Sequence, residues 1–167
     1  MAAGFVTEVP ETVRARLSDT NETAGTFTMT RTLPSGEKFV TSGDYLVRPG
    51  VDFTWRTKTP FATCFYATPE RYVYTNEDER VERRLEDLPH LSRFKAAAKG
   101  DYSAFFDAFD ALYKEEGGLF HFKAKPKVDA LRRVLERVDG DGGPGFWRLK
   151  ASFTDKSSID VEFKDSK

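Results

Sequence analysis

Alternating apolar and polar residues dominate the first half of the chain. In Gly25–Leu33, Phe27 and Met29 alternate with threonines, which is the period-two pattern of a strand rich in β-branched residues. Pro34 and Gly36 then predict a tight turn. Similar patterns predict five further strands, at Lys38–Val47, Phe53–Lys58, Ala62–Ala67, Arg71–Thr75 and Glu79–Leu85. Short connections between successive strands predict an antiparallel meander, because parallel pairing needs crossover helices.

The second half changes to apolar residues three and four positions apart, which predicts helices. Together with a short helix near the N-terminus, the predicted helices are Pro10–Asn21, Leu88–Lys99, Asp101–Glu116 and Pro126–Val138. A glycine-rich loop is expected at Asp139–Gly145. The remaining predicted strands are Leu119–Lys125, Phe146–Phe153 and Ser158–Phe163. This order predicts one α+β domain over residues 1–167, with an antiparallel sheet and helices packed on one side of it.

Composition restricts the class of partner. The formal net charge is -1, with 26 basic and 27 acidic residues, so nothing favours a nucleic-acid partner or steady attachment to anionic lipid. No apolar run reaches the length of a membrane span. The chain contains 15 phenylalanines, and 14% of its residues are aromatic. Such a set of rings builds either an ordinary core or the wall of an apolar ligand cavity.

Motifs of catalysis or metal binding are absent from the sequence. Cys64 lies in an apolar run, and His90 and His121 lack the spacing of a zinc helix. Asp139–Gly143 begins like a calcium loop, but Lys150 stands where the bidentate glutamate of that loop is required. We therefore expect a protein that is not an enzyme and uses no cofactor and no metal.

One stretch carries a family resemblance. Gly25-Thr26-Phe27-Thr28, Gly43–Pro49, Phe53-Thr54-Trp55 and Thr59-Pro60 resemble the LolA family of periplasmic carriers of outer-membrane lipoproteins. Asp101–Leu112 and the final hairpin resemble short LolA-like proteins more loosely. Gly43–Pro60 is the specific part of the resemblance.

The resemblance implies a strongly curved antiparallel sheet, an incomplete β-barrel, with helices covering its concave face. It implies a monomer whose apolar cavity holds acyl chains, with an inner-membrane LolCDE-type ABC transporter and an outer-membrane LolB-type acceptor as partners. Met1–Pro10 has no signal-peptide pattern, so a periplasmic location predicts that such a peptide has been removed. Arg48 would latch a lid formed by Leu88–Lys99. The residues expected to line the cavity are Phe27, Met29, Leu46, Phe53, Trp55, Phe65, Leu91, Phe94, Phe105 and Phe109.

Two other functions remain open at the level of sequence. An enzyme or binding protein for another hydrophobic small molecule would bring polar groups together in the cavity, for example Tyr45, Arg48 and Tyr66. An adaptor domain would have a filled core without a cavity.

Overall fold

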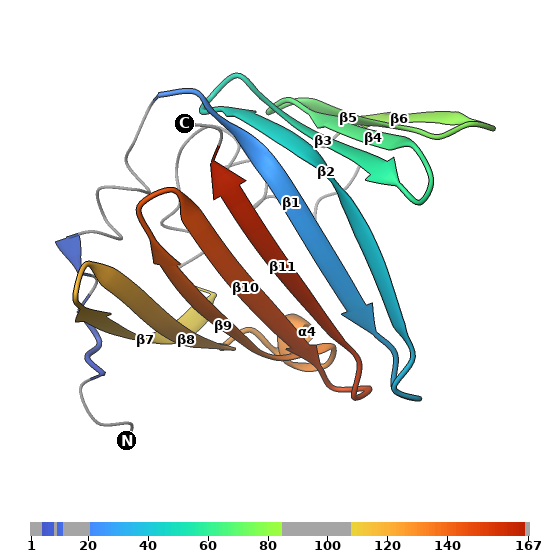
Figure 1. Ribbon diagram of the computed structural model, residues 1–167. Coiled ribbons are helices and arrows are strands. Elements are labelled where there is room, and N and C mark those ends of the chain that lie inside the picture. The colour runs from blue at the N-terminus through green and yellow to red at the C-terminus, as the bar shows by residue number, and fades with distance from the viewer. Residues whose placement is uncertain (1–4, 9, 12–20, 85–107, 166–167) are drawn as a thin grey trace.

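A single open antiparallel sheet makes up most of the computed structural model, which describes residues 5–8, 10–11, 21–84 and 108–165. Figure 1 shows the arrangement of its strands. Within these residues the strands are β1 (Thr23–Thr32), β2 (Lys38–Arg48), β3 (Asp52–Thr59), β4 (Thr63–Ala67), β5 (Arg71–Thr75), β6 (Arg80–Arg84), β7 (Phe109–Glu116), β8 (Leu119–Pro126), β9 (Leu135–Gly143), β10 (Phe146–Phe153) and β11 (Ser158–Asp165). A one-turn helix, α4 (Asp129–Arg132), precedes β9.

The order of the strands is that of an up-and-down barrel that has not closed. It runs β6-β5-β4-β3-β2-β1-β11-β10-β9-β8-β7, so each strand pairs with the next one along the chain, except that β6 does not pair with β7. Pairing of β1 with β11 brings the first and last strands together. The two free edges are therefore β6 and β7, which are consecutive in the chain.

The sheet twists strongly. In Figure 1, β3 to β6 run at a different angle from β1, β10 and β11. Glycines permit close approach of neighbouring strands within it. A Cβ atom at Gly25 would lie 2.1 Å from the carbonyl oxygen of Lys164, and one at Gly43 would lie 1.8 Å from that of Arg56. The register of β2 on β3 also shifts at Ser42 and Gly43, which marks a bulge of the kind that bends a sheet.

The strand register separates the side chains into two faces. One face is apolar from β5 to β7, and we call it the aromatic face. The opposite face, here the polar face, is largely charged or hydroxylic. Residues of the aromatic face include Phe27, Met29, Tyr45, Phe53, Trp55, Phe65, Tyr72, Tyr113, Phe120, Phe122, Trp147, Leu149, Val161 and Phe163.

The helix predicted over Asp101–Glu116 is wrong in its second half, where Phe109–Glu116 forms β7. Phe109 and Tyr113 are four residues apart, which suits one side of a helix. With Ala111 between them they also suit one side of a strand. Pairing with β8 decides the outcome, because both residues then cover the aromatic face.

The helix predicted over Pro126–Val138 is also wrong beyond its first part. Only Asp129–Arg132 is helical, and Leu135–Gly143 forms β9. The glycine-rich loop predicted at Asp139–Gly145 is likewise wrong, because most of it belongs to this strand. Its glycines are tolerated in a strand since rings from β8 cover two of them, as described below.

The helices expected to cover the concave face are not seen among the described residues. Leu88–Lys99, most of Pro10–Asn21 and Asp101–Asp107 lie outside those residues. In the described part of the chain, no helix is long and apolar enough to cross a membrane. The sheet itself, open and antiparallel, agrees with the predicted incomplete barrel.

Candidate functional site

A first cluster of rings covers the aromatic face from β5 to β11. Phe27 on β1 and Trp55 on β3 stack with ring centroids 3.8 Å apart. Trp55 also meets the edge of Phe163 on β11, at 5.7 Å. Phe53 and Phe65 continue the row across β3 and β4 at 6.3 Å. Edge-to-face and offset contacts of this kind stabilise aromatic packing beyond simple burial, so the cluster forms a defined wall.

A second cluster covers the aromatic face from β10 to β7. Phe120 is only 2% exposed and meets Trp147 edge to face, with centroids 4.7 Å apart. The ring of Phe120 lies over Gly142, and that of Phe122 lies over Gly140. Burial raises the pKa of the neighbouring Tyr113 hydroxyl above its usual value. On β9, the rings of Phe120 and Phe122 thus cover two glycines, where a central strand would ordinarily have side chains of its own.

The two clusters meet where Phe163 pairs with Trp147, and an aliphatic band lies beside them, two residues further along the same strands. Met29, Val161 and Leu149 lie side by side on β1, β11 and β10 in this band, and all three are half-buried. Thr41, which pairs with Met29, has a buried hydroxyl oxygen without a hydrogen-bond partner among the described contacts. The band therefore offers apolar surface, and the Thr41 hydroxyl oxygen lies buried next to it.

Arg48 belongs to a different cluster, on the polar face. It donates through Nε and Nη2 to the carboxylate of Asp52, with Nε at 2.7 Å from Oδ1. Tyr66 donates its hydroxyl proton to the same carboxylate at 3.0 Å. Asp52 is 7% exposed, and such a buried carboxylate requires partners. These contacts clamp the β2–β3 hairpin, where Arg48 and Asp52 are paired.

The cluster shifts the pKa values of its members. Hydrogen bonds from Arg48 lower the pKa of Asp52 despite the opposing effect of burial. The bond to Asp52 raises the pKa of the Arg48 guanidinium, and it also raises that of Tyr66. All three groups therefore keep their usual charge states at neutral pH.

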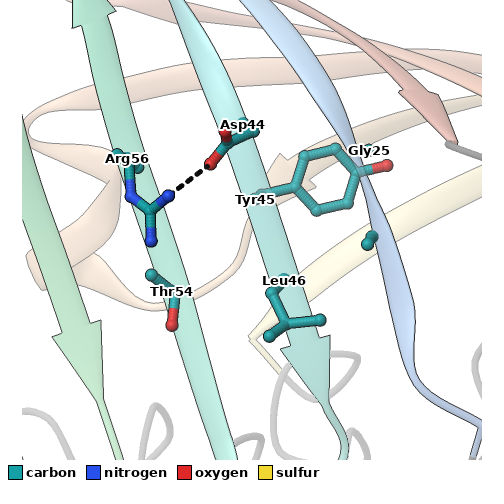
Figure 2. A pocket seen from close by; sticks show the side chains of 7 residues that line it. Gly25, Asp44, Tyr45, Leu46, Thr54 and Arg56 are labelled. Atoms are coloured by element: carbon teal, nitrogen blue, oxygen red, sulfur yellow. Dashed lines mark ion pairs between the residues drawn. The ribbon is translucent and has the colours of Figure 1, made fainter.

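A shallow hollow with a volume of ≈ 350 Å³ lies beside strands β1 to β3 (Figure 2). Leu46 and Thr54 line it together with Asp44, which pairs with Lys58 at 2.9 Å and with Arg56 at 4.0 Å. Its residues are Ala24, Gly25, Asp44, Tyr45, Leu46, Thr54 and Arg56. Its lining mixes apolar and charged side chains, and the hollow is open to solvent.

The predicted site residues divide among these places. Those on the aromatic face are Phe27, Met29, Phe53, Trp55, Phe65 and Phe109. Leu46 and Arg48 lie on the polar face, so the structure does not bring them to that wall. Leu91, Phe94, Phe105 and the lid that Arg48 was expected to latch lie outside the described residues. Sequence reasoning omitted Phe120, Trp147 and Phe163, although each occupies an alternating position of a predicted strand.

Few other side chains in the described ranges are candidates for catalysis or metal binding. His121 contacts Asp141 on the polar face as a cross-strand pair. Cys64 is half-buried on β4 with a free thiol. Within these ranges no group of three or more His, Cys, Asp or Glu residues is arranged to hold a metal ion.

Comparisons with known proteins find similarity at the level of structure. No family model matches the sequence, and no curated protein matches it. A LolA superfamily protein from Nitrosomonas europaea is similar with a TM-score of 0.48 and 6% identity, over 95% of this chain and 93% of that chain. A DUF1329 family protein from Desulfovibrio piger is similar with a TM-score of 0.46 and 8% identity, over 89% and 86% of the two chains.

Proposed function

We propose that this protein is a periplasmic carrier that binds the acyl chains of a lipoprotein, or of a related lipid, on its aromatic face. The observation that carries the proposal is the continuity of that face across the open sheet, from Tyr72 on β5 to Tyr113 on β7. A cargo of this chemistry needs a long apolar surface and few polar contacts.

Acyl chains gain free energy on such a surface in proportion to the area removed from water, about 25 cal/mol per Å². The aliphatic band that runs beside the two ring clusters supports a linear chain as the ligand. Met29, Leu149 and Val161 keep part of their surface uncovered, whereas Phe27 and Phe120 are almost completely buried. The band is therefore one part of the face with surface left for a ligand, and half-buried rings such as Trp55 and Phe163 also keep some.

The pathway is also a proposal. A carrier of this kind would receive cargo from an inner-membrane ABC transporter of the LolCDE type and deliver it to an outer-membrane acceptor of the LolB type. It would act as a monomer and without covalent chemistry. The support for these partners is the sequence resemblance over Gly43–Pro60.

An enzyme on the same scaffold has weaker support. Its expected polar cluster would combine Tyr45, Arg48 and Tyr66 near the ligand. Arg48 and Tyr66 do converge, on Asp52, but on the polar face. Tyr45 lies on the other face, where its hydroxyl donates to Asp165 at 2.7 Å.

Lipid analysis of protein purified from its native host tests the proposal directly. We expect mass spectrometry of organic extracts to detect acyl-containing molecules in molar proportion to the protein. Protein without extractable lipid, which also fails to bind a dansylated fatty acid, would contradict the proposal.

A pair of variants tests whether the ligand binds to the aromatic face or to the polar face. Leu149 and Lys150 are adjacent on β10 and lie on opposite faces. We expect Leu149→Gln to weaken binding of the dansylated fatty acid and Lys150→Gln to leave it unchanged. Circular dichroism checks that both variants are folded. Equal binding by the two folded variants would remove the aromatic face from consideration.

Energy transfer from the two tryptophans to the ligand gives a separate measure of where the ligand binds. Trp55 belongs to the first ring cluster and Trp147 to the second. In Trp55→Phe and Trp147→Phe, the remaining indole is the only energy donor to a bound dansyl group. Transfer from both indoles is expected for a chain lying across the band.

A further inference from the structure

The aromatic face becomes more exposed along β1 and β2 towards the turn that joins these strands. On β1, Phe27 is 2% exposed, Met29 is half-buried and Arg31 is exposed. On β2, Tyr45 is buried, whereas Phe39, which pairs with Arg31, is 54% exposed. A ligand lying along these strands would therefore meet solvent at the end of the sheet where the turn lies.

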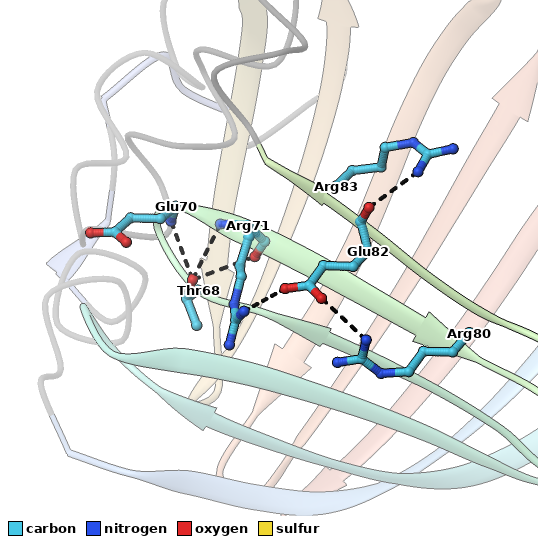
Figure 3. Close-up of polar contacts among 6 residues, drawn as sticks. All are labelled: Thr68, Glu70, Arg71, Arg80, Glu82 and Arg83. Carbon is cyan, nitrogen blue, oxygen red and sulfur yellow. Dashed lines mark hydrogen bonds and ion pairs between the residues drawn. The ribbon is translucent and has the colours of Figure 1, made fainter.

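Arg31 brings a positive charge to this end of the aromatic face. It pairs with Phe39 on β2 and with Ile159 on β11, and it forms no hydrogen bond or ion pair among the described contacts. A second arginine of the aromatic face, Arg83 on β6, donates to the backbone carbonyl of Glu82 at 3.1 Å (Figure 3). The guanidinium of Arg31 thus keeps its five N–H donors for a ligand.

The other charged groups at this end of the sheet belong to the β1–β2 and β10–β11 turns. They are Glu37, Lys38, Asp155 and Lys156. Asp155 accepts hydrogen bonds from the backbone N–H of Ser157, at 2.8 Å, and from its hydroxyl. These bonds lower the pKa of Asp155 most, and the charge of Arg31 adds a smaller effect. Since the four charges of the turns cancel, Arg31 supplies the excess positive charge.

The opposite end of the same strands carries a carboxylate. Asp165 on β11 pairs with Gly25 and accepts the hydroxyl proton of Tyr45 at 2.7 Å. Gly25 and Arg31 are six residues apart on β1, which is about 20 Å along a strand. The aromatic-face positions between them are apolar. This arrangement is complementary to a long amphiphile whose negatively charged head lies at Arg31 and away from Asp165.

We propose that Arg31 binds the anionic head group of the cargo, a carboxylate or a phosphate, while the acyl chain runs from Met29 towards the ring clusters. A guanidinium suits either group because it donates two parallel hydrogen bonds to a pair of oxygens. Its charge selects acidic lipids over neutral lipids of equal chain length and fixes the direction in which the chain lies. The inference rests on the proposed function, since it assigns the head group of the same cargo.

Displacement of a neutral apolar dye, diphenylhexatriene, measures the contribution of the head group. The competing ligands have equal chains and are hexadecanol, palmitate and palmitoyl lysophosphatidic acid, each below its micelle-forming concentration at mildly alkaline pH. We expect the wild type to bind both anionic ligands roughly fivefold more tightly than the alcohol, as for a partly exposed charged contact. Arg31→Gln should lose this preference and keep its affinity for hexadecanol. The anionic ligand whose affinity falls more identifies the carboxylate or the phosphate as the preferred group.

Arg83→Gln is the matched control, because it removes the second arginine of the aromatic face at the far edge of the sheet. It should keep the preference for anionic ligands, and circular dichroism checks that both variants are folded. Equal wild-type affinity for all three ligands, or a preference that survives Arg31→Gln, overturns the inference and leaves the proposed function intact. Failure of the dye and of every ligand to bind overturns the proposed function itself.

Quenching of tryptophan fluorescence by brominated palmitate tests the direction of the chain without a variant. Trp147 pairs with Phe163, which pairs with Phe27, and Trp55 pairs with Tyr45, so both indoles lie further from the turn than Met29. Palmitate brominated near its methyl end should therefore quench more strongly than palmitate brominated near its carboxylate. The reverse order would place the head group at the opposite end and overturn the inference.

Discussion

Phe27 on β1 stacks on Trp55 on β3, although strand β2 lies between them. The residue of β2 that pairs with Phe27 is Gly43. A Cβ at that position would meet the backbone of Arg56 and Thr57 on β3, so the missing Cβ permits the close approach of β2 and β3. The ring contact ties three strands together and sets the first ring cluster of the aromatic face.

Replacing Gly43 tests how much the sheet depends on this approach. The Cβ of Gly43→Ala would lie 1.8 Å from the backbone carbonyl oxygen of Arg56, a clash that flexible side-chain motion cannot relieve. We expect the free energy of unfolding to fall by about 2–4 kcal/mol, in the range of strongly destabilising backbone changes. Urea unfolding measures the loss, and Thr28→Ala on the exposed side of β1 is the control. A loss no larger than that of the control would contradict the close approach.

The second ring cluster permits a double-mutant test. The Cβ of Gly142→Ala would lie 2.4 Å from Cζ of Phe120, so the single variant should be destabilised because a buried ring must move. In Phe120→Leu the side chain is smaller, and adding Gly142→Ala should then cost less. We expect a coupling energy of about 1 kcal/mol between the two positions. Strictly additive losses of unfolding free energy would show that the ring does not rest on the glycine.

Local pattern predicted the strands of the first half well, because Gly25–Leu33 and its successors alternate with period two. It failed for β7 and β9, whose apolar residues suit both a helix and a strand. In β7, Phe109 and Tyr113 are placed by pairing with β8, and such pairing depends on residues distant in sequence. The choice between helix and strand in such segments is therefore decided by pairing partners that are distant in the sequence.

For a related reason, the sequence alone did not show which of the predicted cavity residues lie on the aromatic face. Tyr45, Leu46 and Val47 are consecutive apolar residues, so their pattern alone does not say which of them faces the aromatic wall. The register does, because Tyr45 pairs with Trp55, and Leu46 then falls on the opposite face. Arg48 follows the same parity and meets Asp52. The resemblance to a carrier family does not specify this alternation.

Asp52→Asn tests the clamp of the β2–β3 hairpin through its pH dependence. Hydrogen bonds from Arg48 lower the pKa of Asp52 in the folded protein. Its contribution to stability is therefore complete above the unfolded-state pKa, about 3.9. That contribution is lost as pH falls through the lower folded-state value. We expect the variant to be less stable than the wild type at neutral pH, by about 1–3 kcal/mol for loss of a charged hydrogen-bond acceptor.

Urea unfolding from neutral pH to about pH 2 distinguishes this clamp from simple loss of packing. The difference in unfolding free energy between wild type and Asp52→Asn should shrink in acid, because the unfolded wild-type chain then binds a proton that the folded carboxylate resists. Asp110→Asn, at an exposed position of β7, is the control. A difference that stays constant across this range would mean that the charge of Asp52 contributes nothing.

Thr41→Val tests the unpartnered hydroxyl on the aromatic face. Valine has nearly the same shape, so the change removes a buried polar atom without opening a cavity. An unsatisfied buried hydroxyl costs about 1–3 kcal/mol, and its removal should therefore stabilise the empty protein. We expect thermal unfolding to shift upward by about 2–4 °C for each kcal/mol in a chain of this size. Thr28→Val, on the exposed face of β1, is the control and should change little.

The same variant has the opposite expected effect on a cargo that carries an ester. If the Thr41 hydroxyl donates to an ester carbonyl of the bound lipid, Thr41→Val loses that bond and affinity falls by about fivefold, equivalent to about 1 kcal/mol. Affinity for a hydrocarbon probe without the ester should be unchanged, because only apolar contacts remain. Fluorescence displacement with a diacyl ester and with the hydrocarbon measures both. A variant that is less stable than the wild type and binds the ester equally well would show that the hydroxyl serves the fold and not the cargo.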